Sequence, residues 1–170
     1  MRIILVGYRA TGKTTLAKTL GDELSLECLD ADVVLEDKEG FSIAKIFSEK
    51  GESYFRELET AVLKELLQKE KIVLALGGGV VVRPENRELL KGQNGTVVWL
   101  TATPKTIAQR LSQDAKTEAQ RPSLTDKEPL DEVKTLLAQR EPWYREVADF
   151  SVSTEGKTVP MLAREIIDRL

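Results

Sequence analysis

Apolar residues along the chain fall into short runs that alternate with longer amphipathic stretches. The short runs predict five strands, at residues 3–6, 26–29, 71–76, 96–100 and 150–153. Helical spacing, prolines and capping residues predict helices at about 13–24, 33–38, 42–49 and 52–69, and further helices opening near 84, 104, 129 and 160. Such alternation is typical of a parallel sheet covered on both faces. The pattern therefore predicts an α/β protein with three αβα layers and a five-stranded parallel sheet.

One segment, from about residue 112 to 128, departs from this pattern. It is polar, lacks periodicity and contains Arg121-Pro122. Long connections of this kind are often functional lids, so we expect a mobile lid here. The next helix should run from Pro129 toward Arg140, with Pro142 breaking or kinking it. Because no repeat or linker divides the chain, residues 1–170 are expected to form a single domain.

The composition narrows the class of protein. Of the 170 residues, 41% are hydrophobic and 31% are charged, which fits one globular domain rather than a disordered chain. The formal net charge of −3 gives no broad positive field, so we expect no nucleic-acid partner. The chain has no histidine, which excludes Ser-His hydrolases and His-ligated zinc sites.

The same composition bears on the cellular location. No apolar run reaches the roughly 18 residues of a membrane span, so no membrane association is expected. The N-terminal apolar run is short and leads into a glycine loop, so we interpret it as a core strand and not as a signal peptide. Cys28 is the single cysteine, so no internal disulfide can form and a reducing cytoplasm fits.

Residues 7–14 read Gly-Tyr-Arg-Ala-Thr-Gly-Lys-Thr and match the spacing of a P-loop. Gly7 and Gly12 let the backbone wrap around phosphate oxygens, and the helix opening near Lys13 directs its positive end at the same anion. Lys13 adds an ammonium for the β- and γ-phosphates, and the Thr14 hydroxyl can bind Mg²⁺. The motif follows a predicted strand and opens a predicted helix, so it predicts an ATP site rather than a chance glycine turn.

Asp30 and Asp32 follow the second predicted strand. Ligands bind at the carboxyl ends of the strands in open α/β sheets, and residues two apart in an extended segment point the same way. One carboxylate could hold water on Mg²⁺, and the other could remove a proton from a substrate hydroxyl, since no histidine is present to do so. The alternative is that the pair caps the next helix.

Two further groups could hold a substrate. Arg56 and Glu59 are spaced to pair on one helix, either as a surface ion pair or as an oriented guanidinium that grips a substrate carboxylate. Gly77-Gly78-Gly79 directly follows the third strand, either as a tight turn or as backbone that approaches ligand hydroxyls. For Arg121 and Arg140, taken one at a time, the sequence does not distinguish a binding role from a solvated surface position.

Taken together, these motifs resemble the shikimate kinase family over essentially the whole chain. The residues that carry the resemblance are 7–14, Asp30-Ala31-Asp32, Phe55-Arg56-x-x-Glu59, Gly77-Gly78-Gly79, Arg121-Pro122 and Arg140-Glu141-Pro142-Trp143-Tyr144-Arg145. The resemblance implies a P-loop kinase domain of the nucleoside monophosphate kinase type, with substrate-binding helices at about 33–62. It implies transfer of the ATP γ-phosphoryl to the 3-hydroxyl of shikimate in aromatic amino acid biosynthesis. We expect a cytoplasmic monomer.

The resemblance also implies roles for individual residues. The ATP-binding residues would be Gly7, Ala10, Thr11, Gly12, Lys13, Thr14, Thr15, Arg110, Arg121 and Pro160, with Arg110 and Pro160 flanking adenine. Mg²⁺ would be held by Thr14 and Asp30. Shikimate would be bound by Asp32, Arg56, Gly78, Gly79 and Arg140, and the catalytic residues would be Lys13, Asp32 as base, and Arg121 from the lid. One departure is Ala10, where the family often has glycine. The lid is also somewhat longer than usual.

Three alternatives to this function stay open. The nearest is another small-molecule P-loop kinase that resembles gluconate kinase, although such an enzyme needs neither two carboxylate-binding arginines nor the three glycines. The second is a GTP-binding switch, but the sequence has no Asn-Lys-x-Asp guanine motif. The third is an inactive regulatory relative that binds the ligands without turnover.

Overall fold

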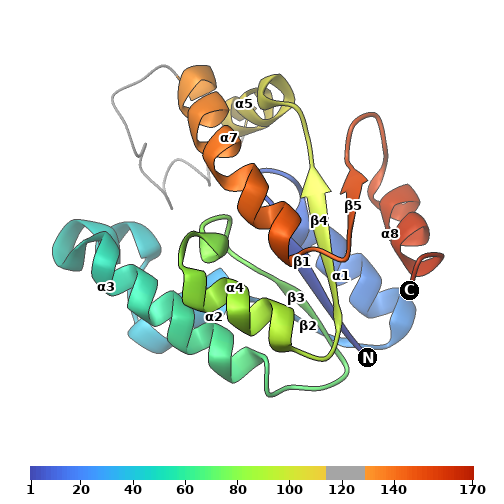
Figure 1. Ribbon diagram of the computed structural model, residues 1–170, viewed down its shortest axis with the longest axis horizontal. Helices are drawn as coiled ribbons and strands as arrows, with labels where there is room; N and C mark the ends of the chain where they lie inside the picture. The colour runs from blue at the N-terminus through green and yellow to red at the C-terminus, as the bar shows by residue number, and fades with distance from the viewer. Residues whose placement is uncertain (114–128) are drawn as a thin grey trace.

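The computed structural model describes residues 1–113 and 129–170 (Figure 1). Most of the predicted lid, with Arg121, lies outside these residues. Five strands form one wholly parallel sheet in the order β2-β3-β1-β4-β5. The strands are β1 (Arg2–Val6), β2 (Glu27–Asp30), β3 (Ile72–Ala75), β4 (Thr96–Thr101) and β5 (Phe150–Ser153). The predicted sheet is thus confirmed.

Helices occupy most of the connections between the strands. They are α1 (Lys13–Leu24), α2 (Ala31–Glu39), α3 (Ile43–Leu66), the 3₁₀ helix η1 (Val80–Val82), α4 (Pro84–Gly92), α5 (Pro104–Gln113), α7 (Pro129–Val147) and α8 (Val159–Ile167). None of the helices in the described ranges is long and apolar enough to cross a membrane.

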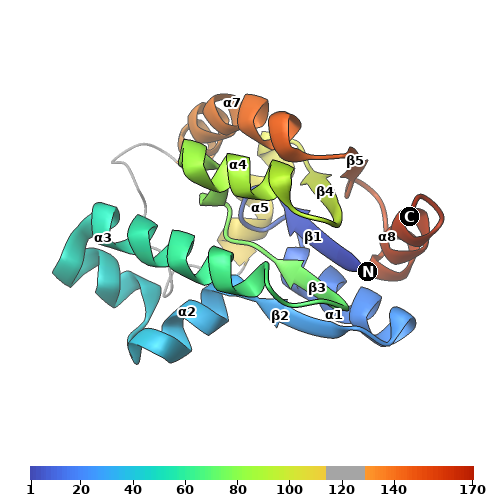
Figure 2. The same cartoon turned by 60° about the horizontal axis from the view of Figure 1, so that its bottom comes forward.

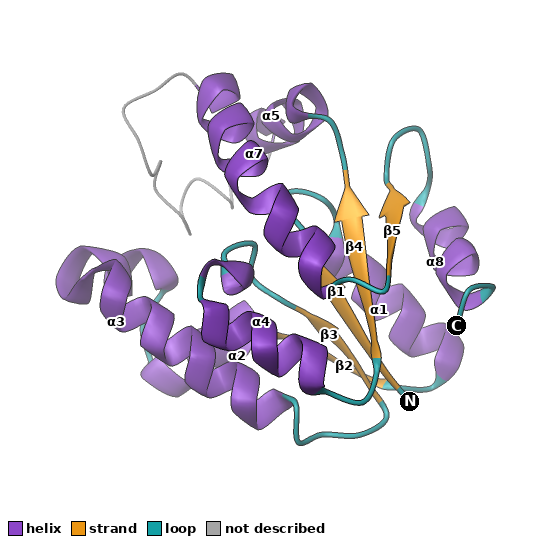
Figure 3. Cartoon of the chain, viewed as in Figure 1, coloured by secondary structure: helices purple, strands orange, loops and turns teal. Residues whose placement is uncertain are grey.

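The helices cover both faces of the sheet, as Figures 2 and 3 show. Ile3 and Leu5 of β1 pack in one core with residues of α1 and α8. Ile4 and Val6 face the other way and pack in a second core with residues of α2, α3, α4 and α7. Since all four side chains are fully buried, each contributes roughly 1.5–3 kcal/mol to folding. Alternate positions of one strand therefore hold the two helical layers against the sheet.

The two helices expected at about 42–49 and 52–69 are confirmed as the two parts of α3, which meet at a kink where Gly51 departs from helical geometry (φ 82°, ψ 171°). Two local features differ from the expectations. The helix α7 does not break at Pro142 but continues to Val147. The short helix η1 was not expected. In each case tertiary packing, which no local pattern encodes, sets the outcome.

The register brings several motifs to one edge of the sheet. Asp30 at the end of β2 pairs with Ala75 at the end of β3, and Leu5 of β1 also pairs with Ala75. The P-loop follows β1, the acidic pair ends β2, and the three glycines follow β3. The carboxyl ends of three adjacent strands therefore carry the candidate functional residues.

Candidate active site at the carboxyl edge of the sheet

The P-loop backbone depends on its two glycines. Gly7 has φ of 144°, and a Cβ atom there would lie 2.5 Å from the Leu100 carbonyl oxygen. Gly12 has φ of 88° and is the N-cap of α1. L-residues rarely adopt either conformation, so a side chain at these positions would distort the loop. The loop thereby leads directly into the N-terminus of α1 at Lys13, where a helix favours an anion.

The P-loop side chains are held by the loop's own carbonyls. Lys13 is a buried residue, and its ammonium donates to the carbonyls of Gly7 and Tyr8 at 2.8 Å each. The Thr11 hydroxyl also donates to the Tyr8 carbonyl at 2.8 Å. These bonds hold the Lys13 ammonium against the loop. A phosphate bound in the loop would add a charge-assisted hydrogen bond to this ammonium. Thr15 follows on the exposed side of α1.

The loop also contacts distant parts of the chain. Arg110 of α5 donates to the Ala10 carbonyl at 3.2 Å and to the Thr154 hydroxyl at 3.0 Å. Arg9 forms a 2.7 Å ion pair with the buried residue Glu132 of α7. Arg110 therefore borders the P-loop, and its role beside adenine stays a prediction. Pro160 lies exposed in the first turn of α8.

The acidic pair lies beside the P-loop. The Thr14 hydroxyl donates to the Asp30 carboxylate at 2.5 Å. Asp30 is also the N-cap of α2 and accepts a bond from the Asp32 backbone N–H at 2.9 Å. The capping alternative is thus confirmed for Asp30, which at the same time is in contact with the P-loop hydroxyl. Asp32 lies in the first turn of α2 and is partly buried.

Arg56 and Glu59 form a buried ion pair, so the interpretation as a surface pair was wrong. Arg56 is 9% exposed and Glu59 is 6% exposed, and their charged groups are 2.7 Å apart. Burial alone would lower the pKa of the Arg56 guanidinium, but the charges and hydrogen bonds of Glu59 and Glu52 outweigh burial and raise it. The guanidinium therefore stays charged and fixed in orientation.

Residues 77–79, the triglycine turn, lie between the P-loop and Arg56. A Cβ atom on Gly78 would lie 3.1 Å from the Arg9 backbone nitrogen and 3.3 Å from the Gly7 carbonyl oxygen. A Cβ atom on Gly79 would lie 2.3 Å from Nη1 of Arg56. Backbone therefore approaches the P-loop on one side and the guanidinium on the other, and a side chain at either glycine would force its neighbour to shift.

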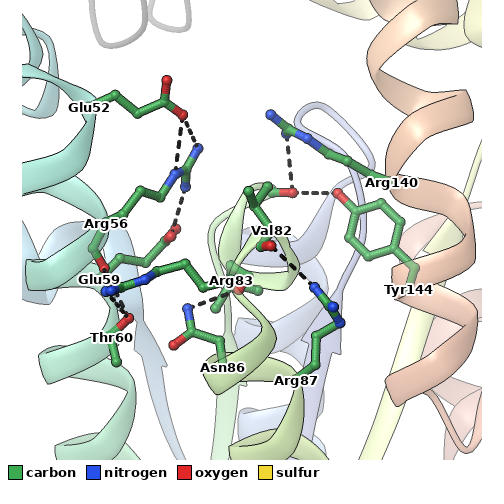
Figure 4. Close-up of polar contacts among 12 residues, drawn as sticks. Glu52, Arg56, Glu59, Thr60, Val82, Arg83, Asn86, Arg87, Arg140 and Tyr144 are labelled. Atoms are coloured by element: carbon green, nitrogen blue, oxygen red, sulfur yellow. Dashed lines mark hydrogen bonds and ion pairs between the residues drawn. The ribbon is translucent and has the colours of Figure 1, made fainter.

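Arg140 reaches the same turn from the opposite helix. Its guanidinium donates to the Gly78 carbonyl at 3.3 Å, and the Tyr144 hydroxyl donates to the same oxygen at 2.5 Å. Figure 4 shows Arg56 approaching from α3 and Arg140 from α7, with the turn between them. Two guanidinium groups thus converge on one backbone turn next to a phosphate loop. This arrangement suits a small acceptor with a carboxylate.

Three polar side chains that the sequence did not single out hold η1, which follows the turn, and link its end to α3 (Figure 4). The Asn86 amide donates to the Val80 carbonyl at 2.9 Å, and Arg87 donates to the Val81 carbonyl at 2.8 Å. Arg83 donates to the Arg56 carbonyl at 3.2 Å and to the Thr60 hydroxyl at 3.1 Å. No motif of the sequence singles them out: Asn86 and Arg87 bond to carbonyls six residues earlier, and Arg83 bonds to two residues of the distant helix α3.

Comparison with known proteins decides between the remaining functions. A family model described as shikimate kinase matches residues 9–170. A shikimate kinase from Rhodopirellula baltica is 42% identical over 165 residues, which cover 97% of this chain and 88% of that protein. The chain belongs to the shikimate kinase family. A shikimate kinase from Acinetobacter baumannii, solved in complex with shikimate, superposes with a TM-score of 0.92 at 38% identity and covers 99% of this chain and 91% of that one.

Membership of the shikimate kinase family makes the chain an ATP-dependent phosphotransferase with shikimate kinase activity. The chain is much less similar to a gluconate kinase. A gluconokinase from Sinorhizobium meliloti has 14% identity and a TM-score of 0.56, over 98% of this chain and 89% of that one, and so shares the fold alone.

Proposed function

We propose that this chain transfers the γ-phosphoryl of ATP to the 3-hydroxyl of shikimate, giving shikimate 3-phosphate and ADP, with the nucleotide in the P-loop and the acceptor between Arg56 and Arg140. The observation that carries this proposal is the position of the triglycine turn. Its backbone packs on Gly7 and Arg9 of the P-loop and against the Arg56 guanidinium, and it accepts a bond from Arg140. Donor and acceptor would therefore meet across one turn.

On the nucleotide side, residues 7–15 bind the phosphates. The backbone N–H groups around Gly12 and the Lys13 ammonium stabilise charge on the β- and γ-phosphates. Arg110 and Pro160 flank adenine, a role supported for Arg110 by its bonds to Ala10 and Thr154. Arg121, outside the described residues, keeps its sequence-based role on the transferring phosphoryl group.

Magnesium would be held by Thr14 and Asp30. The hydroxyl and the carboxylate are already 2.5 Å apart, and oxygen atoms are the ligands that Mg²⁺ prefers. Within the described ranges no group of three or more His, Cys, Asp or Glu side chains could hold a metal alone, so this site would depend on nucleotide oxygens as well. When bound, Mg²⁺ supplies charge neutralisation at the β- and γ-phosphate oxygens.

On the acceptor side, Arg56 and Arg140 hold the carboxylate, and the Gly78-Gly79 backbone binds ring hydroxyls. Asp32 accepts the proton of the 3-hydroxyl while the oxygen of that hydroxyl forms a bond to the γ-phosphorus. The bond between that phosphorus and the β–γ bridging oxygen breaks, and ADP leaves. We infer that the chain acts as a monomer in the cytoplasm and that residues 1–170 work as one domain.

The proposal is tested by ADP formation with ATP or GTP and a panel of acceptors that includes shikimate and gluconate. We expect turnover with ATP and shikimate, and loss of turnover on removal of Mg²⁺. Turnover with gluconate but not with shikimate would overturn the assignment, and so would ATP binding without turnover on any acceptor.

Matched variants test the individual roles. Lys13→Ala should lower kcat by at least about 100-fold, because phosphoryl transfer depends on positioned charge. Asp32→Asn should lower kcat by a similar factor, because an amide cannot take a proton. Lys18→Ala and Asp22→Asn, at exposed positions of α1, are the controls and should behave like the wild type. A normal kcat in Asp32→Asn would exclude Asp32 as the base.

A further inference from the structure

Tyr144 is a buried residue of α7 that none of the predicted roles includes. Its side chain is completely buried, and its ring stacks on Trp99 with centroids 5.8 Å apart and planes at 22°. Its hydroxyl donates to the Gly78 carbonyl oxygen at 2.5 Å (Figure 4). A tyrosine hydroxyl buried in an apolar core normally needs such a partner. This partner, however, belongs to the turn that separates the P-loop from Arg56.

The Gly78 carbonyl has a second donor on the same helix. Arg140 lies one turn before Tyr144, and its guanidinium donates to the same oxygen at the longer distance of 3.3 Å. A carbonyl oxygen has two lone pairs, so the two donors fill its capacity. The tyrosine makes the shorter bond, which leaves the charged group only loosely held by the backbone.

Removal of the hydroxyl would change this balance. Among the described residues, the buried carbonyl would then keep only the guanidinium as a partner, and bonds from charged donors are the stronger ones. Arg140 would be drawn toward the Gly78 oxygen, so fewer of its N–H groups would be available to another anion. Burial also raises the pKa of Tyr144 far above its ordinary value, so the hydroxyl stays a donor over the whole working pH range.

We propose that Tyr144 is a positioning residue: by occupying the Gly78 carbonyl, its hydroxyl keeps the Arg140 guanidinium available for the carboxylate of the acceptor. This inference rests on the proposed role of Arg140 in acceptor binding. It predicts that the hydroxyl acts on acceptor binding through Arg140 and leaves the nucleotide side unchanged.

The test is the variant Tyr144→Phe, assayed with ATP and shikimate. Loss of the hydroxyl should raise the KM for shikimate by about tenfold, the worth of one charge-linked hydrogen bond. The kcat and the KM for ATP should stay within about twofold of the wild type. Equal effects on both substrates, or an unchanged KM for shikimate, would overturn the proposal.

A double-mutant cycle shows whether the effect passes through Arg140. In an Arg140→Met background, Tyr144→Phe should change kcat/KM for shikimate by less than about twofold, because the group that it positions is gone. Independent, additive effects would contradict the proposal. If the wild type does not phosphorylate shikimate at all, the proposed function fails and not this inference alone.

Two further variants separate positioning from packing. Trp99→Phe loosens the ring stack but keeps the Tyr144 hydroxyl, so it should lower the melting temperature without raising the KM for shikimate. An equal rise in that KM would show that loose packing is the cause. Incorporation of 4-aminophenylalanine at position 144 restores an N–H donor and should return the KM toward the wild-type value. Failure of this replacement to rescue a folded protein would count against the hydroxyl as a donor.

Discussion

At the scale of single residues, Ala10 occupies a backbone conformation that glycine adopts more easily. Its φ is 60°, in the left-handed region, and its carbonyl is fixed by Arg110. The left-handed conformation costs an L-residue about 1–2 kcal/mol. The P-loop thus carries backbone strain at the position where the family often has glycine.

The variant Ala10→Gly should therefore be more stable than the wild type. Relief of the strain outweighs the extra freedom that glycine gives the unfolded chain, about 0.4–1 kcal/mol, so the free energy of unfolding should rise by about 0.5–1 kcal/mol. Urea denaturation measures the difference. Ala17→Gly, inside α1, is the control and should lose at least about 1 kcal/mol. A destabilised Ala10→Gly protein would mean that the strain is absorbed elsewhere.

Gly79 provides a second prediction at this scale. In Gly79→Ala the new methyl group would overlap the Arg56 guanidinium, so Arg56 must turn away from its present place. We expect the KM for shikimate to rise at least about tenfold while the KM for ATP changes little. Gly92→Ala, with open space around its Cβ position, is the control. An unaffected KM in Gly79→Ala would remove Arg56 from the acceptor site.

How far the sequence predicts the site depends on the distance between partners along the chain. The P-loop, its helix and the Arg56–Glu59 pair follow from spacing of a few residues, and the general rule for strand ends brings Asp30 to the loop. The bonds from Arg140 and Tyr144 to Gly78 span 62 and 66 residues. No local pattern specifies such contacts, so the support of the triglycine turn became known only from the fold.

At the scale of elements, α7 is unusual because it runs through Pro142. Proline lacks the backbone N–H and crowds the preceding turn, which commonly costs about 3 kcal/mol inside a helix. Residues on both sides of the proline are held by the triglycine turn. Arg140 before it and the buried Tyr144 after it both donate to the Gly78 carbonyl. Anchors on both sides therefore hold the helix together across the proline.

Replacement of this proline should stabilise the helix. Pro142→Ala restores an N–H donor and removes the clash, and after allowance for the freer unfolded chain the free energy of unfolding should rise by about 1–2 kcal/mol. Pro84→Ala is the control, since Pro84 opens α4, where proline is well tolerated, and its effect should stay within about 0.5 kcal/mol. Equal changes in the two variants would show that Pro142 is not a site of strain.

The same contrast explains which elements the sequence could predict. Prolines that open helices at Pro84, Pro104 and Pro160 act locally and indicated their helices correctly. The break expected at Pro142 was wrong. Arg140 and Tyr144 contact the Gly78 carbonyl, and Tyr144 stacks on Trp99 of β4, so α7 is held on both sides of the proline. The 3₁₀ helix η1 was missed for a related reason: its carbonyls are held by side chains of the next helix.

At the scale of the whole molecule, the described surface carries few large exposed apolar side chains. They are Met1, Val33, Phe41, Met161 and Leu170. Some exposed apolar side chains are normal on the surface of a folded monomer.

We therefore expect the protein to be a monomer in solution. Sedimentation equilibrium at micromolar concentration should give a mass near 19.0 kDa. A mass near twice that value, independent of salt, would contradict the monomer and would call for the exposed residues of the interface to be mapped.

The position of Gly78 has a consequence for attempts to redirect the protein toward new acceptors. Its backbone borders the P-loop, while its neighbour borders Arg56, so one turn serves both substrates. Substitutions at Gly78 would disturb the P-loop together with the acceptor side, whereas substitutions at Gly79 reach the Arg56 guanidinium alone. Libraries for directed evolution should therefore spare Gly78 and diversify Gly79 together with the pair formed by Arg56 and Glu59 on α3. Selection for a new acceptor can then change the acceptor preference of the kinase while ATP binding is preserved.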